Sequence, residues 1–116
     1  MMNRIEIVDH GVMLNDYFHG TSGVWLNIHF DNETTIKDII ESLENEINMV
    51  WDHIEGVAHY HNFTSNLEKC VDNCINDIKE ENKDKMQDIV FPDIELSEDE
   101  DCENPVLIFT IEFFEE

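Results

Sequence analysis

The most informative part of the sequence is residues 34–55, which read TTIKDIIESLENEINMVWDHIE. Apolar side chains recur in it at the 3.6-residue spacing of an α-helix, at Ile36, Ile39, Ile40, Leu43, Ile47, Val50, Trp51 and Ile54. Thr34 or Thr35 can cap the start of this helix, and Gly56 is a natural stop. The pattern predicts one helix over residues 35–54, with Trp51 in the core.

Carboxylates occupy the opposite side of this predicted helix. They are Asp38, Glu41, Glu44, Asp52 and Glu55. A second helix is predicted to begin at Thr64 or Ser65. Its apolar stripe consists of Leu67, Cys70, Val71, Cys74, Ile75 and Ile78. Both helices are thus predicted to be amphipathic, and the first presents a row of acids to solvent.

Strands are predicted on both sides of the helical region. The predicted ranges are 4–14 with a turn or bulge near residues 9–11, 24–30, a short strand at 57–63, a short strand at 89–91, and 106–114. The last is continuously apolar, which is typical of a central buried strand. Trp25 alternates away from the apolar face of its strand, and packing under a helix is favoured over a role as a surface anchor. The predicted fold class is α+β, a mostly antiparallel sheet of about four strands with two helices on one face.

The net charge is the unusual property of this chain of 116 residues. Asp and Glu number 28 against 6 Lys and Arg, which gives a formal net charge of −22. Solubility of a small domain needs a net charge of only about 2–8 in magnitude. The excess therefore points to a basic partner, although a purely solvated acidic surface is the alternative. Phosphate backbones and anionic membrane surfaces repel such a protein, so we expect neither to be a direct ligand.

The acidic character increases towards the C-terminus, where no Lys or Arg follows Lys85. Residues 92–104 are interpreted as a mobile acidic loop within one domain that covers residues 1–116. Four acids of this loop join those of the first helix as candidate partner-binding residues. They are Glu98, Asp99, Glu100 and Asp101.

The three cysteines, Cys70, Cys74 and Cys102, are sparse and odd in number, which favours a reducing compartment over a disulfide scaffold. No apolar run is long enough to span a bilayer, and the N-terminal residues lack the apolar stretch of a signal peptide. We therefore expect a cytoplasmic protein.

Metal binding and catalysis are weaker interpretations. His59 and His61 on a predicted strand, with Cys70 and Cys74 on the second helix, are ligand types that suit zinc, but their spacing is unspecific. A Cys–His dyad from the same residues would place the thiol among carboxylates, which disfavours the thiolate. Neither a phosphate loop, a serine elbow nor an HExxH motif is present. We expect no enzyme activity, no metal and no cofactor.

Residues 14–80 resemble a known family. The run YFHGTSGVWL at 17–26, the acidic helix and GVAHYHNF at 56–63 resemble the N-terminal part of ArdA-type antirestriction proteins. Those proteins share a glycine-containing loop, a Gly-x-Trp strand and a short His-containing strand. Here His61 and Asn62 stand where the family tends to be acidic, and ArdA proteins are longer. The resemblance implies a DNA mimic made by a phage or mobile element, and small anti-CRISPR proteins act by the same principle.

The functional prediction is an acidic DNA mimic. It would occupy the basic nucleic-acid-binding groove of a host defence protein, either a restriction–modification or a CRISPR subunit. The alternative is an immunity protein that neutralises a cognate nuclease toxin, and a metal-binding sensor domain is a further alternative. The sequence is also compatible with a homodimer.

Overall fold

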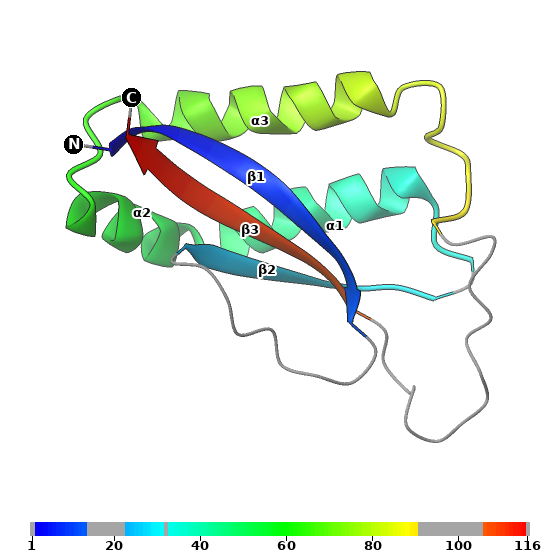
Figure 1. Ribbon diagram of the computed structural model, residues 1–116. Helices are drawn as coiled ribbons and strands as arrows, with labels where there is room; N and C mark the ends of the chain where they lie inside the picture. Colours follow the sequence, from blue (N-terminus) through cyan, green and yellow to red (C-terminus); the bar gives the residue numbers. More distant parts are fainter. Residues whose placement is uncertain (1, 14–22, 32, 91–105, 116) are drawn as a thin grey trace.

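The computed structural model describes residues 2–13, 23–31, 33–90 and 106–115. The elements follow the order β1 (Met2–Met13), β2 (Val24–His29), α1 (Ile36–Met49), α2 (Trp51–Tyr60), α3 (Leu67–Glu81) and β3 (Val106–Glu115). The strands form an antiparallel sheet in the order β1-β3-β2, and the three helices pack against one face of it (Figure 1). The α+β class is therefore confirmed. The described residues contain three strands and three helices, whereas about four strands and two helices were predicted.

The central position of β3 is confirmed and follows from its composition. Its residues from Leu107 to Ile111 are all buried, and it is paired with β1 on one side and β2 on the other. The irregularity predicted in the first strand is also present, as a register shift between Asp9 and Val12. In β2, Val24, Leu26 and Ile28 alternate into the core as expected.

The prediction of a short strand at 89–91 is wrong for the two residues of this segment that the structure describes, Ile89 and Val90. Ile89 forms one isolated bridge with Thr35, and Phe91 lies outside the described part of the chain. This segment instead provides a hydrogen-bond acceptor for the start of α1, because the Ile36 amide donates to the Asp88 carbonyl at 3.0 Å. The first amides of a helix have no partner within it, so an external acceptor is needed there.

The single helix predicted over 35–54 is divided at Val50. This residue ends α1 and precedes α2, with φ −105° and ψ 18°. The apolar stripe continues across the break, since Ile47 and Ile54 are both buried and Trp51 is half-buried against the same core. Val50 is neither glycine nor proline, so the sequence carried no local signal for the interruption. The prediction that Trp51 belongs to the core is confirmed only in part.

The strand predicted at 57–63 is wrong, because α2 continues through Gly56 to Tyr60. The chain leaves the helix through the C-cap His61 and then Asn62, whose φ of 56° lies in the left-handed region. The Phe63 amide donates to the Ala58 carbonyl and the Asn62 amide donates to the His59 carbonyl. These are the two hydrogen bonds of a Schellman motif with asparagine in place of the usual glycine.

The position of Gly56 inside α2 leads to a stability prediction. Gly56 is exposed, and a Cβ built on it meets no atom within 4 Å. Gly56→Ala is therefore expected to raise the free energy of unfolding by about 0.5–1 kcal/mol, since alanine restricts the unfolded chain and favours helix. Urea unfolding of both proteins measures this change. An unchanged or lower midpoint would contradict a helix at this position.

Gly23 is predicted to behave in the opposite way. It precedes β2, and a Cβ built on it would lie 2.5 Å from the backbone carbonyl oxygen of Ile111. Backbone cannot move aside as a flexible side chain can, so Gly23→Ala is expected to cost about 1–3 kcal/mol. Urea unfolding of Gly23→Ala and of the wild type measures this loss of stability. Wild-type stability in Gly23→Ala would show that β2 does not approach β3 this closely.

The two faces of the sheet differ in their covering. The helices cover the face that carries Leu26, Phe109 and Ile111. Trp25 lies on the opposite face and is 39% exposed, so the expected packing under a helix is wrong. No described helix is long and apolar enough to cross a membrane.

The second predicted helix is confirmed as α3, with Val71 and Ile75 buried on the predicted stripe. Its N-cap is Asn66, whose side chain accepts from the Lys69 amide, and not Thr64 or Ser65. The predicted acidic loop at 92–104 lies outside the described residues.

Candidate functional site

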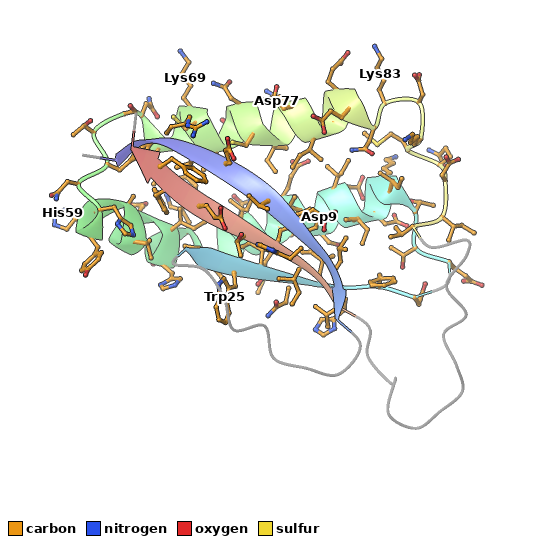
Figure 2. All side chains as sticks on the ribbon, in the orientation of Figure 1. Asp9, Trp25, His59, Lys69, Asp77 and Lys83 are labelled. Atoms are coloured by element: carbon orange, nitrogen blue, oxygen red, sulfur yellow. The ribbon has the colours of Figure 1, made fainter. Side chains whose placement is uncertain are left out.

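Acidic side chains occupy much of the surface of the helical layer. None of the described carboxylate side chains is buried, and most are exposed. Lys69 of α3 and Lys83 of the turn after it project away from the sheet (Figure 2). Lys83 is neutralised by an ion pair with Glu80 at 2.9 Å. The resulting surface combines many carboxylates with few cations available to a partner.

Asp38 and Glu41 are both exposed on α1, as predicted. Asp38 has a structural role in addition, because its carboxylate accepts from the Thr35 amide while the Thr35 hydroxyl accepts from the Asp38 amide. This reciprocal capping box fixes the start of α1. Glu41 has no such role in the described contacts and remains a candidate for partner binding.

Glu44 is half-buried and faces α3. Its carboxylate forms an ion pair with the Lys79 ammonium at 3.0 Å, which links α1 to α3. Both side chains are about two-fifths exposed, so the pair is partly screened by solvent. Glu44 therefore contributes less free negative charge than the sequence pattern suggested.

Asp52 and Glu55 lie on α2 and are exposed. The break at Val50 places them on a separate helix from Asp38 and Glu41. Glu55 instead comes together with Glu68 of α3 at a shallow hollow that is also lined by Trp51. The four loop candidates, Glu98, Asp99, Glu100 and Asp101, lie outside the described residues.

A second group of acids, which the sequence analysis did not select, lines the seam between β1 and α3. Glu6 of β1 and Asp77 and Glu81 of α3 line one hollow there. Asp77 and Glu81 are four residues apart, so they follow one side of α3. That spacing was readable in the sequence. Their position beside β1 was not, because it depends on how the helix packs on the sheet.

The described residues show no arrangement of side chains that supports the metal-binding or the catalytic alternative. No group of three or more His, Cys, Asp or Glu side chains is arranged there to hold a metal ion. His59 projects outward from α2 (Figure 2), whereas His61 stacks on Phe113 with ring centroids 5.6 Å apart. Cys70 and Cys74 pack against the core as free thiols. Residues 59 and 61 do not share a strand face, because residue 59 is helical and residue 61 caps the helix.

A buried polar cluster lies on the other sheet face. The His10 Nε2 atom lies 2.8 Å from the Thr110 hydroxyl and 4.0 Å from a Glu112 carboxylate oxygen. Thr110 is completely buried, so its hydroxyl is out of reach of any substrate. The cluster satisfies a buried hydroxyl and stabilises the sheet.

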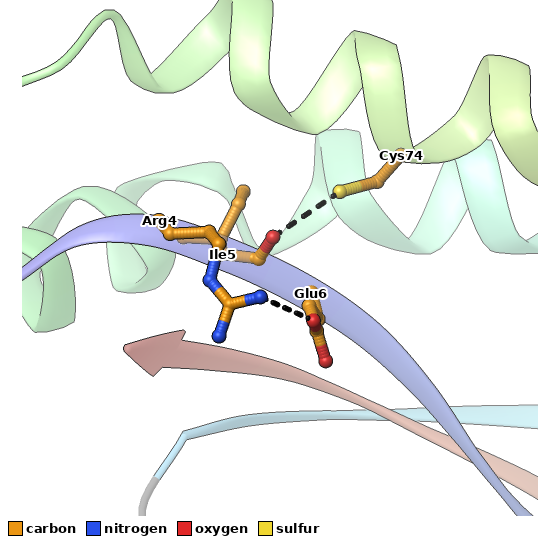
Figure 3. Close-up of polar contacts among 4 residues, drawn as sticks. All are labelled: Arg4, Ile5, Glu6 and Cys74. Carbon is orange, nitrogen blue, oxygen red and sulfur yellow. Dashed lines mark hydrogen bonds and ion pairs between the residues drawn. The ribbon is translucent and has the colours of Figure 1, made fainter. Parts of the chain in front are cut away.

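Cys74 yields a prediction about pH. Its Sγ lies 3.7 Å from the Ile5 carbonyl oxygen, to which the thiol donates (Figure 3). Burial raises the pKa of the Cys74 thiol, and the nearby Asp77 carboxylate raises it further, while a hydrogen bond from the Ile7 amide opposes both. The folded state thus favours the neutral thiol. The contribution of the neutral Cys74 thiol to stability is present below the pKa that this thiol has in the unfolded chain. It is lost as the pH rises through the higher pKa of the thiol in the folded protein.

The measurement compares the free energies of unfolding of wild type and Cys74→Ala in urea from neutral to alkaline pH. The difference between the two proteins is expected to narrow as the pH rises above the ordinary thiol pKa. Other titrating groups are common to both proteins and cancel. Parallel curves across this range would show that Cys74 titrates alike in the folded and unfolded states.

These features define an acidic α+β protein in which, among the described residues, the exposed carboxylates lie mainly on the helical layer. No family model, curated protein or solved structure matches the chain. The resemblance to ArdA-type proteins stays an expectation from the sequence pattern. One part of the pattern differs in structure, because the segment expected to be a His-containing strand belongs largely to α2.

Proposed function

We propose that this protein is a stoichiometric, non-catalytic inhibitor that mimics DNA. It binds in the basic nucleic-acid-binding groove of a host defence protein, a restriction–modification or CRISPR subunit, and excludes nucleic acid from it. The observation that carries this proposal is the net charge of −22 together with the exposure of the carboxylates. Duplex DNA carries one phosphate charge per about 1.7 Å of axis, and a groove built for it attracts any dense array of anions.

The helical layer is the proposed binding surface. Glu41 of α1, Asp52 and Glu55 of α2, and Asp72 of α3 are all exposed on it. The opposite sheet face is different in character, because it carries Trp25, Asn27 and His29 on the exposed side of β2. Carboxylates directed at a basic groove gain favourable electrostatic energy without any base-specific contact.

The choice of a defence protein as the partner rests on the ArdA resemblance, and the choice of a basic partner rests on charge. In this proposal the protein acts in the cytoplasm of a bacterial host and needs neither metal nor cofactor. It binds neither nucleic acid nor membrane directly, since both carry the same sign of charge as the protein.

An affinity capture with two elutions tests this function. The tagged protein is incubated with bacterial host lysate at low salt, and bound proteins are eluted either with salt or with duplex DNA. The proposal predicts that a restriction or CRISPR subunit is released by DNA as well as by salt. Recovery of one nuclease toxin domain would favour the immunity-protein alternative. Recovery of nothing that DNA displaces would contradict the proposal.

A further inference from the structure

A cavity of about 370 Å³ opens between β1, α1 and the C-terminal half of α3. In Figure 1, α3 and β1 run close together near the chain termini and diverge toward the other end of the molecule. The floor of the cavity is apolar and comes from α1 and β3. Its residues are Ile39, Ile40, Leu43, Leu107 and Phe109. The volume falls in the lower part of the range of about 300–1,000 Å³ found for ligand pockets.

The cavity is open to solvent and its rim is acidic. Ile7 and Ile78 at its edge are only half-buried, which shows that the apolar lining extends to the surface. Asp9 of β1 and Glu81 of α3 are exposed at the same rim. An apolar opening with two carboxylates beside it is complementary to two neighbouring side chains of a partner. The apolar one would enter the opening and the cationic one would pair with the carboxylates.

A second hollow of about 430 Å³ extends this acidic rim along β1 and α3. It shares Ile7, Ile78 and Glu81 with the cavity and adds Asp77 and Glu6. Its lining includes one described base, Arg4, whose guanidinium donates to the Glu6 carboxylate at 2.9 Å (Figure 3). The acids of the seam outnumber this cation, so the seam as a whole favours a positively charged occupant.

We propose that the cavity receives an apolar side chain of the partner, and that Asp9 and Glu81 pair with a lysine or arginine next to it in the partner's chain. This inference rests on the proposed function and adds an anchor to a surface that otherwise binds by distributed charge. A second copy of this chain is a poorer occupant, because each copy carries a net charge of −22. Burial of one leucine or phenylalanine side chain would tighten binding about 10- to 100-fold.

The first test uses two synthetic peptides as probes, one with arginines around a single leucine and one with alanine in place of that leucine. The peptides carry equal charge, so any difference between them reports on the apolar side chain. Methyl resonances of the protein are followed by NMR during titration. We expect the leucine peptide to bind at least tenfold more tightly and to shift the methyl signals of Ile7, Ile36 and Ile78, the half-buried isoleucines of the lining.

The second test uses two double variants with the same change of net charge. Asp9→Asn with Glu81→Gln neutralises the rim, and Glu68→Gln with Asp72→Asn neutralises two exposed acids of α3 that do not line the cavity. We expect the rim variant to lose more affinity for the leucine peptide than the control variant does. Urea unfolding of both variants checks that the fold is retained.

The outcomes separate the anchor from the proposed function. Equal affinity for the two peptides, or equal losses of affinity in the two double variants, would contradict the proposed anchor. The proposed displacement of DNA from a basic partner would be unaffected by either result. Binding of the leucine peptide in the cavity supports the anchor even where the intact protein displaces no DNA, and in that case only the proposed function fails.

Discussion

Ile111→Ala is expected to lower the free energy of unfolding by about 2–5 kcal/mol, which is the usual cost of truncating a fully buried isoleucine. Ile111 is completely buried in the middle of β3 and pairs across the sheet with Ile7 on one side and Val24 on the other. Domains of this kind are stable by only about 5–15 kcal/mol, so the variant should lose a large part of its stability. Urea unfolding followed by circular dichroism measures the loss.

Ile89→Ala is the matched control for this prediction. Ile89 is 45% exposed and forms only the isolated bridge with Thr35. The same chemical change there removes little buried surface, and its cost is expected to stay below about 1 kcal/mol. Similar losses in both variants would mean that β3 is not the central strand of the sheet.

Association with the captured basic partner is expected to slow by roughly a hundredfold between low and high salt. Electrostatic steering raises association rates to about 10⁸–10⁹ M⁻¹s⁻¹, from about 10⁵–10⁶ M⁻¹s⁻¹ without it. The Debye length falls from about 30 Å at 0.01 M salt to about 3 Å at 1 M, so the attraction of a surface with net charge −22 is then screened. Stopped-flow mixing across a salt series measures the association rate.

The attraction comes from many carboxylates, so single neutralisations such as Glu41→Gln or Asp52→Asn should each change this rate very little. Neutralising several exposed acids of the helical layer together should lower the rate at low salt and flatten its salt dependence. A rate independent of salt would contradict steering by charge. A single substitution that abolished binding would contradict a distributed surface.

The fold was predictable where one periodicity dominated a segment. The continuous apolar run of β3 and the 3.6-residue stripe of α3 each had one interpretation, and both are confirmed. The break at Val50 was not predictable, since the stripe passes through it without a glycine or proline.

The segment after Gly56 shows how a short pattern misleads. Alternation over a few residues fits a strand, and a glycine after a long helix fits a stop, so both signals favoured the same wrong assignment. The helical alternative was present as well, because Ile54 and Ala58 are four residues apart and both are buried. Asn62 provides the actual stop, and asparagine is a weaker signal than glycine for a left-handed residue.

The candidate surface was predictable in its charge but not in its arrangement. Sequence identified Glu41, Asp52 and Glu55 as exposed, and the structure agrees. The pairing of Glu44 with Lys79 and the approach of Asp77 to β1 depend on contacts between elements far apart in the chain. The cavity also required the structure, because three separate elements form its walls.

Displacement of DNA tests the central claim most directly. A fluorescent duplex is bound to the purified basic partner, and the anisotropy is followed as the acidic protein is added. The DNA-mimic account predicts that the duplex is released in proportion to the protein added, until the anisotropy reaches that of free DNA. A stable complex that holds partner, duplex and this protein together would contradict the account, because the two ligands would then occupy different sites.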